Sequence, residues 1–512
     1  MQPAGSRQSP LQEMFFSLVS GVLFALTLPE PGLCPFAWFA LAPLLLAVRE
    51  AASVRRAAAL SWLAGAAFFA VSLHWIYLTC RFAGVPVAVG LLAWSALAAF
   101  MALRWALFGA ALRWGAARTP GAAWPWTAAA LWAALEFAFA RFTPFVGADV
   151  LGYSQWRFLS WLQPSSVVGP HGLGFLIVLV NAALALWWMT KTREARRGLV
   201  VAAACALAWW AWGAGMLALR RAPEGLRQSV AILQPAIDQY RKWEEVYAED
   251  IRAEFDGLLA EAAAAKPALI VWPETAVPGW LEEPENWDWV SGWAKRSGAY
   301  HLVGAASDLD ARHHNAAVLV DPQGRRAGDY HKRQLVPFGE FVPFRRWVEP
   351  YIGILSQMGD FDVGAARQAP LASPVGRLGV TLCYEAVFPF WNRASVEAGA
   401  QVLANLTNDG WYKDTWAPYE HFHANVFRAI ENRVTVIRSG NTGISAVIDP
   451  WGRVTAKLPL LERGVLRAEI PSVDPFPERS FYARRGDWFG WLCLGLCAAL
   501  AASALLRRFH GA

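Results

Sequence analysis

Three residues that could act together in nucleophilic catalysis each lie at or near an expected strand end. Cys383 follows the apolar residues 379–382, Glu274 follows residues 268–272, and Lys332 follows residues 329–331. A thiolate is a nucleophile, and a nearby carboxylate can take its proton. An ammonium group lowers the pKa of a thiol and stabilises an oxyanion. If the three strand ends face one cleft, the sequence predicts a cysteine nucleophile with a base and an oxyanion donor.

Each of these residues also has an ordinary structural explanation. A single cysteine at a strand end is more often a small buried apolar residue than a nucleophile. A glutamate after a proline usually lies in a solvated turn, and a lysine in a polar segment such as 330–333 usually lies on the surface. The prediction of catalysis therefore depends on the rest of the chain.

The composition of the chain is too apolar for one soluble globule. Of its 512 residues, 56% are hydrophobic and 17% are charged, and 29 are Trp. The apolar residues are concentrated before about residue 220 and after about residue 485, whereas the middle has the composition of a soluble domain. The net charge of +6 includes no basic run interleaved with aromatic residues, so nucleic acid is not an expected partner.

Eight apolar segments are candidates for membrane-spanning helices, which need about 20 residues each. The first follows a single Arg and lacks the cleavage site of a signal peptide, so we expect it to be retained. The second is short. The expected spans are residues 14–28, 35–48, 58–79, 85–111, 122–140, 172–190, 198–219 and 486–506.

Lys and Arg in the connecting loops predict the orientation of these spans. Twelve lie at the termini and in alternate loops, and three lie in the intervening loops. Because cytoplasmic loops carry an excess of Lys and Arg, we expect both termini in the cytoplasm. Residues 1–220 would then hold seven spans, residues 221–485 an outer domain, and residues 486–512 an eighth span with a cytoplasmic tail. In a bacterium the outer domain would be periplasmic.

Strand and helix patterns alternate through the middle domain. Strands are expected at 229–234, 268–272, 301–306, 316–321, 379–382, 402–406, 434–438, 444–449 and 464–469, and helices at 243–264, 285–298, 389–398 and 418–432. This order predicts an α/β sandwich with its helices on the outside. The sequence has no GxGxxG or Walker loop, so no phosphate-bearing cofactor is expected.

Cysteines and histidines give no pattern of a disulfide or a metal site in the middle domain. Cys383 is the only one of the six cysteines in that domain, and the chain has no CxxC motif. The pairs His313/His314 and His421/His423 lack a matching pattern of acidic residues, so we expect surface or structural roles for them. No metal and no cofactor are expected.

Three blocks of the sequence resemble the catalytic blocks of the nitrilase (carbon–nitrogen hydrolase) superfamily in type, order and spacing. They are residues 271–274, residues 330–340 and residues 382–385, and residues 405–411 and 433–443 resemble the blocks that follow. The resemblance implies an α-β-β-α sandwich. With apolar spans on both sides of this domain, the whole chain resembles the apolipoprotein N-acyltransferase family. Residues 407–412 read Thr-Asn-Asp-Gly-Trp-Tyr where members often have Ser-Asn-Asp-Ala/Thr-Trp-Phe.

The resemblance implies a two-step acyl transfer in the inner membrane of a bacterium. Cys383 would take a fatty acyl chain from a membrane phospholipid as a thioester, with Glu274 as general base and Lys332 stabilising the tetrahedral intermediate. The acyl chain would then pass to the α-amine of the N-terminal S-diacylglyceryl-cysteine of an apolipoprotein. The partners would be the phospholipid donor, the diacylated apolipoprotein and the bilayer.

The resemblance also implies supporting roles. Glu340, Tyr384 and Glu385 would support the three catalytic residues, and Trp243 would lie on a mobile arm near the mouth of the site.

Residues 338–347 are dense in aromatic side chains and contain two Arg, which suits a mouth that admits lipids. The alternative is that this segment only packs on the membrane helices. The lipid-access candidates are Phe338, Phe341, Phe344, Arg345, Arg346 and Trp347.

Two other functions compete with acyl transfer. A membrane-tethered, nitrilase-like amidase would use the same three residues with water as the acceptor, although eight spans are more anchor than a soluble substrate requires. A transporter or structural membrane protein with a degenerate outer domain would need charges within its spans. The candidate spans contain Glu136 and Arg104 and little else of this kind, and the intact set of three polar residues favours an enzyme.

Overall fold

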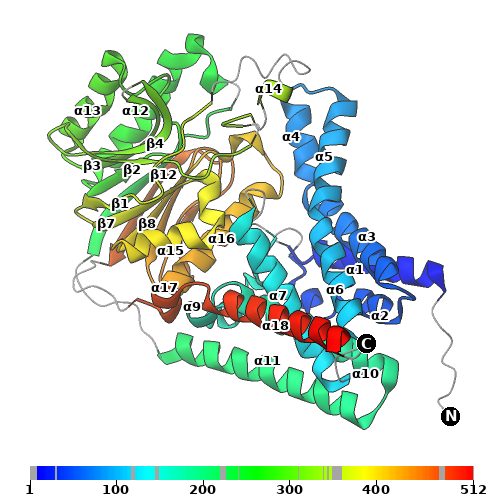
Figure 1. Ribbon diagram of the computed structural model, residues 1–512. Coiled ribbons are helices and arrows are strands. Elements are labelled where there is room, and N and C mark those ends of the chain that lie inside the picture. Colours follow the sequence, from blue (N-terminus) through cyan, green and yellow to red (C-terminus); the bar gives the residue numbers. More distant parts are fainter. Residues whose placement is uncertain are drawn as a thin grey trace, which may run out of the picture. The chain divides into compact units, whose positions relative to one another are not determined.

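The chain forms two compact units, which are residues 1–220 with 485–512, and residues 221–484. The computed structural model describes residues 9–28, 32–116, 121–143, 149–219, 227–239, 241–309, 311–337, 339–342, 345–348, 360–471 and 479–510. The first unit is helical and the second contains both helices and sheets (Figure 1).

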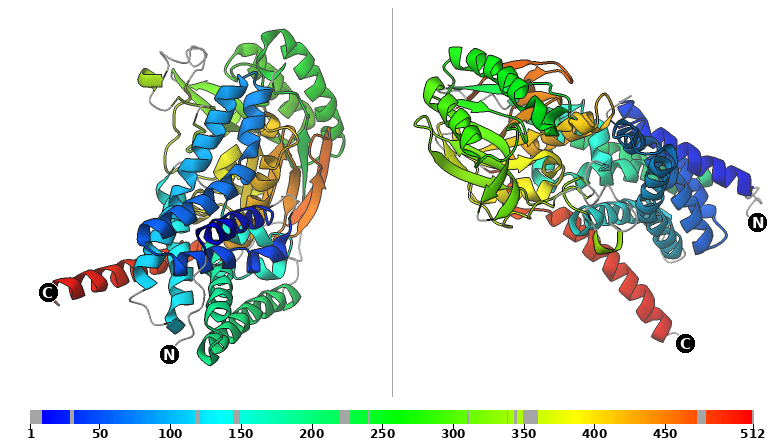
Figure 2. Two further views of the ribbon diagram at one scale, coloured as in Figure 1. Left: turned by 90° about the vertical axis from the view of Figure 1, so that its right-hand side faces the viewer. Right: turned by 90° about the horizontal axis from the view of Figure 1, so that it is seen from above.

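The helical unit consists of long apolar helices joined by short turns. Its last helix, α18, extends beyond the other helices of the unit (Figure 2). The longer helices are α1 (Pro10–Ala25), α2 (Ala42–Glu50), α3 (Val54–Ser72), α4 (His74–Phe82), α5 (Val87–Met101), α6 (Leu103–Ala116), α7 (Trp124–Phe142), α10 (His171–Thr190), α11 (Arg193–Leu219) and α18 (Trp488–His510). The shorter elements are η1 (Cys34–Trp38), η2 (Gly121–Ala123), η3 (Leu151–Gln155), α8 (Leu159–Leu162) and α9 (Ser165–Val168).

Four helical segments in the described part of the chain are long and apolar enough to cross a membrane. They are Val54–Phe82, Val87–Ala116, His171–Thr190 and Arg193–Leu219, and Pro10–Ala25 and Trp488–Ala504 are shorter apolar helices. The expected second span is not one helix, because η1 is followed by the nine-residue α2. Nine residues rise only about 14 Å, about half of the hydrocarbon core. The number of spans therefore stays a prediction.

The two charged residues expected within spans are buried and paired inside the helical unit. Glu136 Oε2 lies 2.9 Å from His171 Nδ1, and Glu136 Oε1 accepts a hydrogen bond of 2.8 Å from the backbone N–H of Leu151. Arg104 pairs with Asp149 at 2.5 Å. A charge in an apolar environment is stable only with such partners. These pairs attach the segment after α7 to the helices, which favours a structural role over a path for ions.

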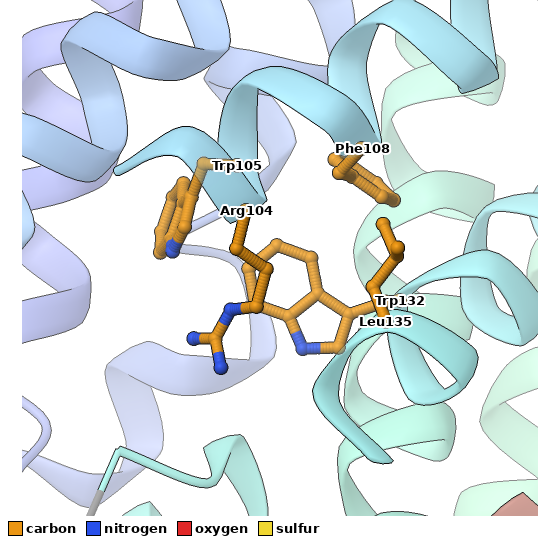
Figure 3. A pocket seen from close by; sticks show the side chains of 5 residues that line it. All are labelled: Arg104, Trp105, Phe108, Trp132 and Leu135. Atoms are coloured by element: carbon orange, nitrogen blue, oxygen red, sulfur yellow. The ribbon is translucent and has the colours of Figure 1, made fainter. Parts of the chain in front are cut away.

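A small cavity lies between α6 and α7, beside Arg104. Figure 3 shows Arg104, Trp105 and Phe108 from α6 beside Trp132 and Leu135 from α7. Its volume of about 10 Å³ is enough for one water molecule at most. This cavity is therefore too small to hold a lipid chain or another substrate.

The second unit contains two six-stranded mixed sheets. The first has the order β12 (Gly464–Pro471), β1 (Arg227–Gln234), β2 (Leu269–Val271), β3 (Tyr300–Leu309), β4 (Arg312–Val320), β5 (Arg326–His331). The second has the order β11 (Val454–Leu458), β10 (Ser445–Ile448), β9 (Thr435–Gly440), β8 (Val402–Thr407), β7 (Gly376–Leu382), β6 (Leu371–Ser373). Strands β1 to β3 are parallel, as are β7 to β9, and the outer strands are antiparallel.

The sheets stack face to face and helices cover their outer faces, which confirms the α-β-β-α sandwich (Figure 1). Side chains of β1 and β2 pack against those of β7 and β8 in the core between the sheets. Helices α12 (Ala248–Ala264) and α13 (Pro284–Ser297) pack on the first sheet. Helices α15 (Pro389–Glu397) and α16 (Ala417–Asn432) contact the second sheet. The central strands are fully buried, so they appear in the sequence as continuous apolar runs.

Strands β6 and β11 are absent from the strands expected from the sequence, and of β5 only the end at residues 329–331 was expected. β6 has three residues, and β5 and β11 are mostly exposed or half-buried. Short strands at a sheet edge give no continuous apolar run and no clean alternation. β5 matters most of the three, because Lys332 follows its last residue.

Gly304 in β3 sets the position of the turn that carries Glu274. A Cβ atom on Gly304 would lie 2.2 Å from the carbonyl oxygen of Pro273 and 2.6 Å from the Cα of Glu274. The turn is held against the strand by a 2.6 Å hydrogen bond from the N–H of Ala276 to the carbonyl of Gly304. Thr275 in this turn has a left-handed φ of 46°, which is strained for a β-branched residue. The turn therefore keeps its place because β3 has no side chain at residue 304.

Replacing Gly304 by Ala should push the Glu274 turn away from β3 and lower the free energy of unfolding by about 1–3 kcal/mol, the usual effect of overpacking. The matched control is Gly257→Ala in α12, where a Cβ would meet no atom within 4 Å. That control should raise stability by up to about 1 kcal/mol, because Ala favours a helix more than Gly does. Chemical unfolding of the two variants tests this, and equal stability of G304A and wild-type protein would contradict it.

Candidate active site

Glu274, Lys332 and Cys383 come together at the ends of three strands from both sheets. Glu274 follows β2 and Lys332 follows β5 in the first sheet, and Cys383 follows β7 in the second. Lys332 Nζ lies 2.9 Å from Glu274 Oε1, and the charges of both residues act on the Cys383 thiol. All three are buried, with 4%, 1% and 5% of their surfaces exposed. The predicted set is therefore one buried cluster of a thiol, a carboxylate and an ammonium group.

Lys332 lies between two carboxylates that share a third partner. Its Nζ is 2.7 Å from Glu340 Oε1, in addition to its contact with Glu274. The side-chain amide of Asn315 donates to both carboxylates, at 2.8 Å and 2.6 Å. The backbone N–H of Asn408 donates to the second oxygen of Glu274 at 2.9 Å. Both carboxylates are therefore held in fixed orientations, and Glu340 lies in contact with Lys332, while its supporting role stays a prediction.

Electrostatics keep Lys332 charged. Burial alone would lower the pKa of its ammonium, but Glu274 and Glu340 outweigh burial and raise this pKa well above its usual value. Lys332 is thus a permanent cation beside the thiol. A buried, positioned ammonium can stabilise a developing oxyanion without reorganising water.

The net pKa of the Cys383 thiol is raised, although Lys332 lowers it as expected. Burial raises this pKa far above its usual value, and the charge of Glu274 raises it further. The opposing effect of the Lys332 ammonium is smaller. A thiol with so high a pKa can attack as a thiolate only if a base takes its proton during the reaction.

The backbone at Cys383 is strained. Its φ is 49°, in the left-handed region that non-glycine residues rarely adopt. Cys383 is also the first residue of the helical turn η8 (Cys383–Val387), and Tyr384 follows it in this turn. Such strain persists only where the surroundings enforce it, and it is common at catalytic residues. The supporting role expected for Tyr384 stays a prediction.

Glu385 joins the strand that carries Lys332 to the strand that carries Cys383. Its Oε2 accepts hydrogen bonds from the Tyr330 hydroxyl at 2.7 Å and from the N–H of Leu382 at 2.8 Å. Its Oε1 accepts from the N–H groups of Arg333 and Gln334 at 2.6 Å and 3.0 Å. Burial raises the pKa of Glu385, although Arg333 opposes this. Glu385 therefore connects the ends of β5 and β7, and its expected support of the catalytic residues stays a prediction.

Lys242 is a buried lysine that the sequence analysis did not single out. Its Nζ donates a 2.9 Å hydrogen bond to the backbone carbonyl of Glu274. Burial lowers the pKa of Lys242 to about 7, although the charge of Glu274 opposes this. Lys242 therefore fixes the backbone of the base. Its neighbour Trp243 lies in the turn η4 (Arg241–Trp243).

A second polar network beside Cys383 was also missed. Asp409 Oδ2 pairs with Arg438 at 2.7 Å, and its Oδ1 accepts from His421 Nδ1 at 3.0 Å. Thr407 donates to the same Oδ1 at 3.2 Å and hydrogen-bonds the Cys383 thiol. Burial would raise the pKa of Asp409, but Arg438 and His421 lower it below its usual value. The signal in the sequence was the polar run 407–409 directly after a buried strand.

This network does not fit a metal ion. Among the described residues, Cys383, Asp409 and His421 form the one group of possible ligands, with their donor atoms within 4.8 Å of one another. Both oxygens of Asp409 already accept hydrogen bonds, one of them from the guanidinium of Arg438. A cation would have to displace this guanidinium or lie close to its positive charge. The polar atoms of this network are therefore arranged to hydrogen-bond one another and not to coordinate a cation.

The lipid-access candidates are only partly within the described chain. Phe338 and Phe344 lie outside the described residues, and the helical turn α14 (Arg345–Val348) contains Arg346 and Trp347. Phe341 is half-buried. Arg345 is tied to Asp360 by two hydrogen bonds of 2.8 Å and 3.0 Å. The role of these residues in lipid access stays a prediction.

Both units of the chain match families of known proteins. Residues 229–475 match the family Carbon-nitrogen hydrolase, and residues 20–183 match the Apolipoprotein N-acyltransferase N-terminal domain. An apolipoprotein N-acyltransferase from Geobacter metallireducens is 36% identical to this chain, over 98% of this chain and 96% of the relative. The chain belongs to the apolipoprotein N-acyltransferase family. A relative of the same name from Azotobacter vinelandii is 33% identical over 96% of this chain and 94% of its own length.

Membership of the apolipoprotein N-acyltransferase family agrees with the two units. Apolar helices form the part that matches the N-terminal domain, so the chain is a membrane protein. The sandwich that contains Cys383 lies within the carbon–nitrogen hydrolase match. Among solved structures, an amidase from Nesterenkonia sp. AN1 covers 52% of this chain and 100% of its own, with 20% sequence identity and a TM-score of 0.39.

Replacing Glu385 by Gln should lower the free energy of unfolding by about 1–3 kcal/mol. Each side-chain oxygen of Glu385 accepts two hydrogen bonds. In Gln an amide nitrogen replaces one of these oxygens, so the two donors that faced that oxygen would lose their acceptor. Chemical unfolding measures the change. Glu397→Gln at the exposed end of α15 is the control, and it should change stability by less than about 0.5 kcal/mol. An equally small effect of E385Q would show that Glu385 does not join the two sheets.

Proposed function

We propose that this protein transfers a fatty acyl chain from a membrane phospholipid to the α-amine of the S-diacylglyceryl-cysteine at the N-terminus of an apolipoprotein. The observation that carries this proposal is the buried cluster of Glu274, Lys332 and Cys383 in a chain of the apolipoprotein N-acyltransferase family. A nucleophile, a base and a fixed cation are the groups that acyl transfer through a thioester requires.

In the first half-reaction, Cys383 attacks the ester carbonyl of the phospholipid. Glu274 takes the thiol proton as the C–S bond forms, because the buried thiol is protonated at rest. Lys332 stabilises the negative oxygen of the tetrahedral intermediate, with the backbone N–H of Tyr384 as a second donor. Glu274 then gives the proton to the leaving alcohol of the lysophospholipid. The product is a thioester on Cys383.

In the second half-reaction, the amine of the diacylated apolipoprotein attacks the thioester. The new C–N bond forms as the C–S bond breaks, which regenerates the thiol of Cys383. One site thus serves two lipid substrates in turn, which gives ping-pong kinetics. Burial of the site supports this order, because water that reached the thioester would hydrolyse it.

The membrane arrangement belongs to the same proposal. Residues 1–220 would contain seven membrane segments, the second of them the interrupted segment of η1 and α2, and residues 486–512 the eighth, with the catalytic domain 221–485 on the periplasmic face of a bacterial inner membrane. The distribution of Lys and Arg in the loops supports this orientation. Trp243 and residues 338–347, with their aromatic side chains and two Arg, would admit the lipids from the bilayer surface.

Incubation of the purified protein with phospholipid vesicles, without an acceptor, should add the mass of one fatty acyl chain. Intact-protein mass spectrometry should show that hydroxylamine removes this adduct and that Cys383→Ala does not acquire it, since a thioester requires the thiol. Cys383→Ser should remain folded without turnover, because an alkoxide is much harder to form than a thiolate. No adduct with any phospholipid, together with hydrolysis of a small amide, would instead support a membrane-tethered amidase.

Lys332→Ala should slow formation of the thioester by more than about a hundredfold, the usual effect of losing one oxyanion donor. The rate of adduct formation on vesicles measures this directly. The variant also leaves two buried carboxylates without their cation, so its thermal unfolding must be recorded alongside. A normal acylation rate would show that Lys332 has only a structural role.

A further inference from the structure

The proposed second half-reaction removes two protons from the acceptor amine, and Glu274, Lys332 and Cys383 together can take only one of them. The acceptor is an α-amino group, whose ordinary pKa of about 7.7–8.0 makes it mostly an ammonium at neutral pH. It must lose two protons, one of which restores the Cys383 thiol. Glu274 can carry that proton from nitrogen to sulfur, and Lys332 is already protonated. The site therefore needs a second proton acceptor.

His421, near the start of α16, lies close to the reacting sulfur. A ring nitrogen of His421, a carboxylate oxygen of Asp409 and the Sγ of Cys383 are all within 4.8 Å of one another. His421 and Asp409 are buried, with 4% and 0% of their surfaces exposed. An amine that attacks a thioester on Cys383 must approach this same sulfur. The imidazole of His421 is therefore one of the buried groups that border the sulfur at which the amine would arrive.

Asp409 decides which nitrogen of His421 carries hydrogen. Arg438 keeps the pKa of Asp409 low, so Asp409 is a carboxylate and can only accept hydrogen bonds. Its contact with His421 Nδ1 at 3.0 Å then requires a hydrogen on Nδ1, which leaves Nε2 of the neutral ring as a proton acceptor. A carboxylate that orients an imidazole and stabilises the imidazolium is the arrangement found in catalytic triads.

The groups around His421 include phenol rings, a carboxylate and cations that are already paired. The ring of Tyr412 lies 5.5 Å away, and burial raises its pKa well above the usual value, so this phenol is neutral. The ring of Tyr384 lies 6.2 Å away, and Glu420 precedes His421 on α16. The cation Arg438 is paired with Asp409, and Lys332 is paired with Glu274 and Glu340. A proton on His421 would thus face a carboxylate directly.

We infer that His421, oriented by Asp409, accepts the proton that converts the acceptor ammonium into an amine. This inference rests on the proposed function. The neutral amine then attacks the thioester carbon. Glu274 takes a second proton from the nitrogen and gives it to sulfur as the C–S bond breaks. The products are the amide, the free thiol and one proton on His421, which later passes to solvent, so all atoms and charges balance.

The test compares two acceptors for the acyl-enzyme. A diacylated lipopeptide enters as an ammonium at about pH 7, where only about a tenth of α-amino groups are neutral, whereas hydroxylamine is already mostly neutral. The acyl-enzyme of each variant is formed on phospholipid vesicles, and its discharge by either acceptor is followed by mass spectrometry. The readout is the ratio of the two discharge rates at two pH values, because a general loss of structure would not be reversed by raising the pH.

His421→Gln should lower the ratio of lipopeptide to hydroxylamine discharge by about tenfold at about pH 7, the fraction set by the ordinary pKa of the amine. This decrease in the ratio should disappear at about pH 9, because solvent has already removed the proton from the α-ammonium group of the lipopeptide. Asp409→Asn, which keeps the shape but not the charge, should shift the ratio in the same direction. His423→Gln on the same helix is the matched control and should leave the ratio unchanged.

Four results would overturn the inference. They are an unchanged ratio in both H421Q and D409N, an equal loss at about pH 7 and pH 9, an equal shift in H423Q, and failure of both H421Q and D409N to form the acyl-enzyme. The last result would assign the pair to the first half-reaction. Absence of the adduct in wild-type protein would overturn the proposed function itself, and with it the role given to His421, and this is measured before any variant.

Discussion

The buried ammonium of Lys332 is the constraint on which the site depends. A cation with 1% of its surface exposed is stable only beside compensating charges, and here Glu274 and Glu340 both contact it. Those carboxylates are in turn fixed by Asn315 and by the backbone of Asn408. Because each charge is held by the others, the cluster keeps its geometry without water. The same arrangement makes the ammonium available to an oxyanion at no further cost of reorganisation.

The two sheets of the sandwich must keep a fixed alignment for this cluster to act on Cys383. Glu274 and Lys332 belong to one sheet, whereas the nucleophile belongs to the other. Glu385 supplies the alignment, because its four accepted hydrogen bonds connect residues after β5 with the end of β7. Within the first sheet, Gly304 determines the position of Glu274, because the turn that carries Glu274 lies directly against the backbone of Gly304. Polar and steric contacts thus define the site to a precision that the apolar core alone does not provide.

Burial determines how the chemistry proceeds. Burial raises the pKa of the Cys383 thiol, so a thiol in this position does not rest as a thiolate that could react with other electrophiles. In the proposed reaction, burial would also keep water from the thioester. Protons released in such a site would first need acceptors within the protein. The pairs Asp409–Arg438 and Asp409–His421 lie near the sulfur, which is why we infer a proton acceptor there.

The sequence by itself determined the division into apolar spans and a middle domain, the sandwich class and the three polar residues at strand ends. These properties follow from local apolar periodicity and from residue types at fixed places in known blocks. Only the tertiary structure decided that the net pKa of Cys383 is raised, that Lys332 bridges two carboxylates, and that Lys242, Asp409 and His421 border the site. It also showed that η1 and the nine-residue α2 replace the expected second span. The physical reason is that burial and charge contacts join residues far apart in the chain, such as Asn408 and Glu274, and local sequence does not encode such distances.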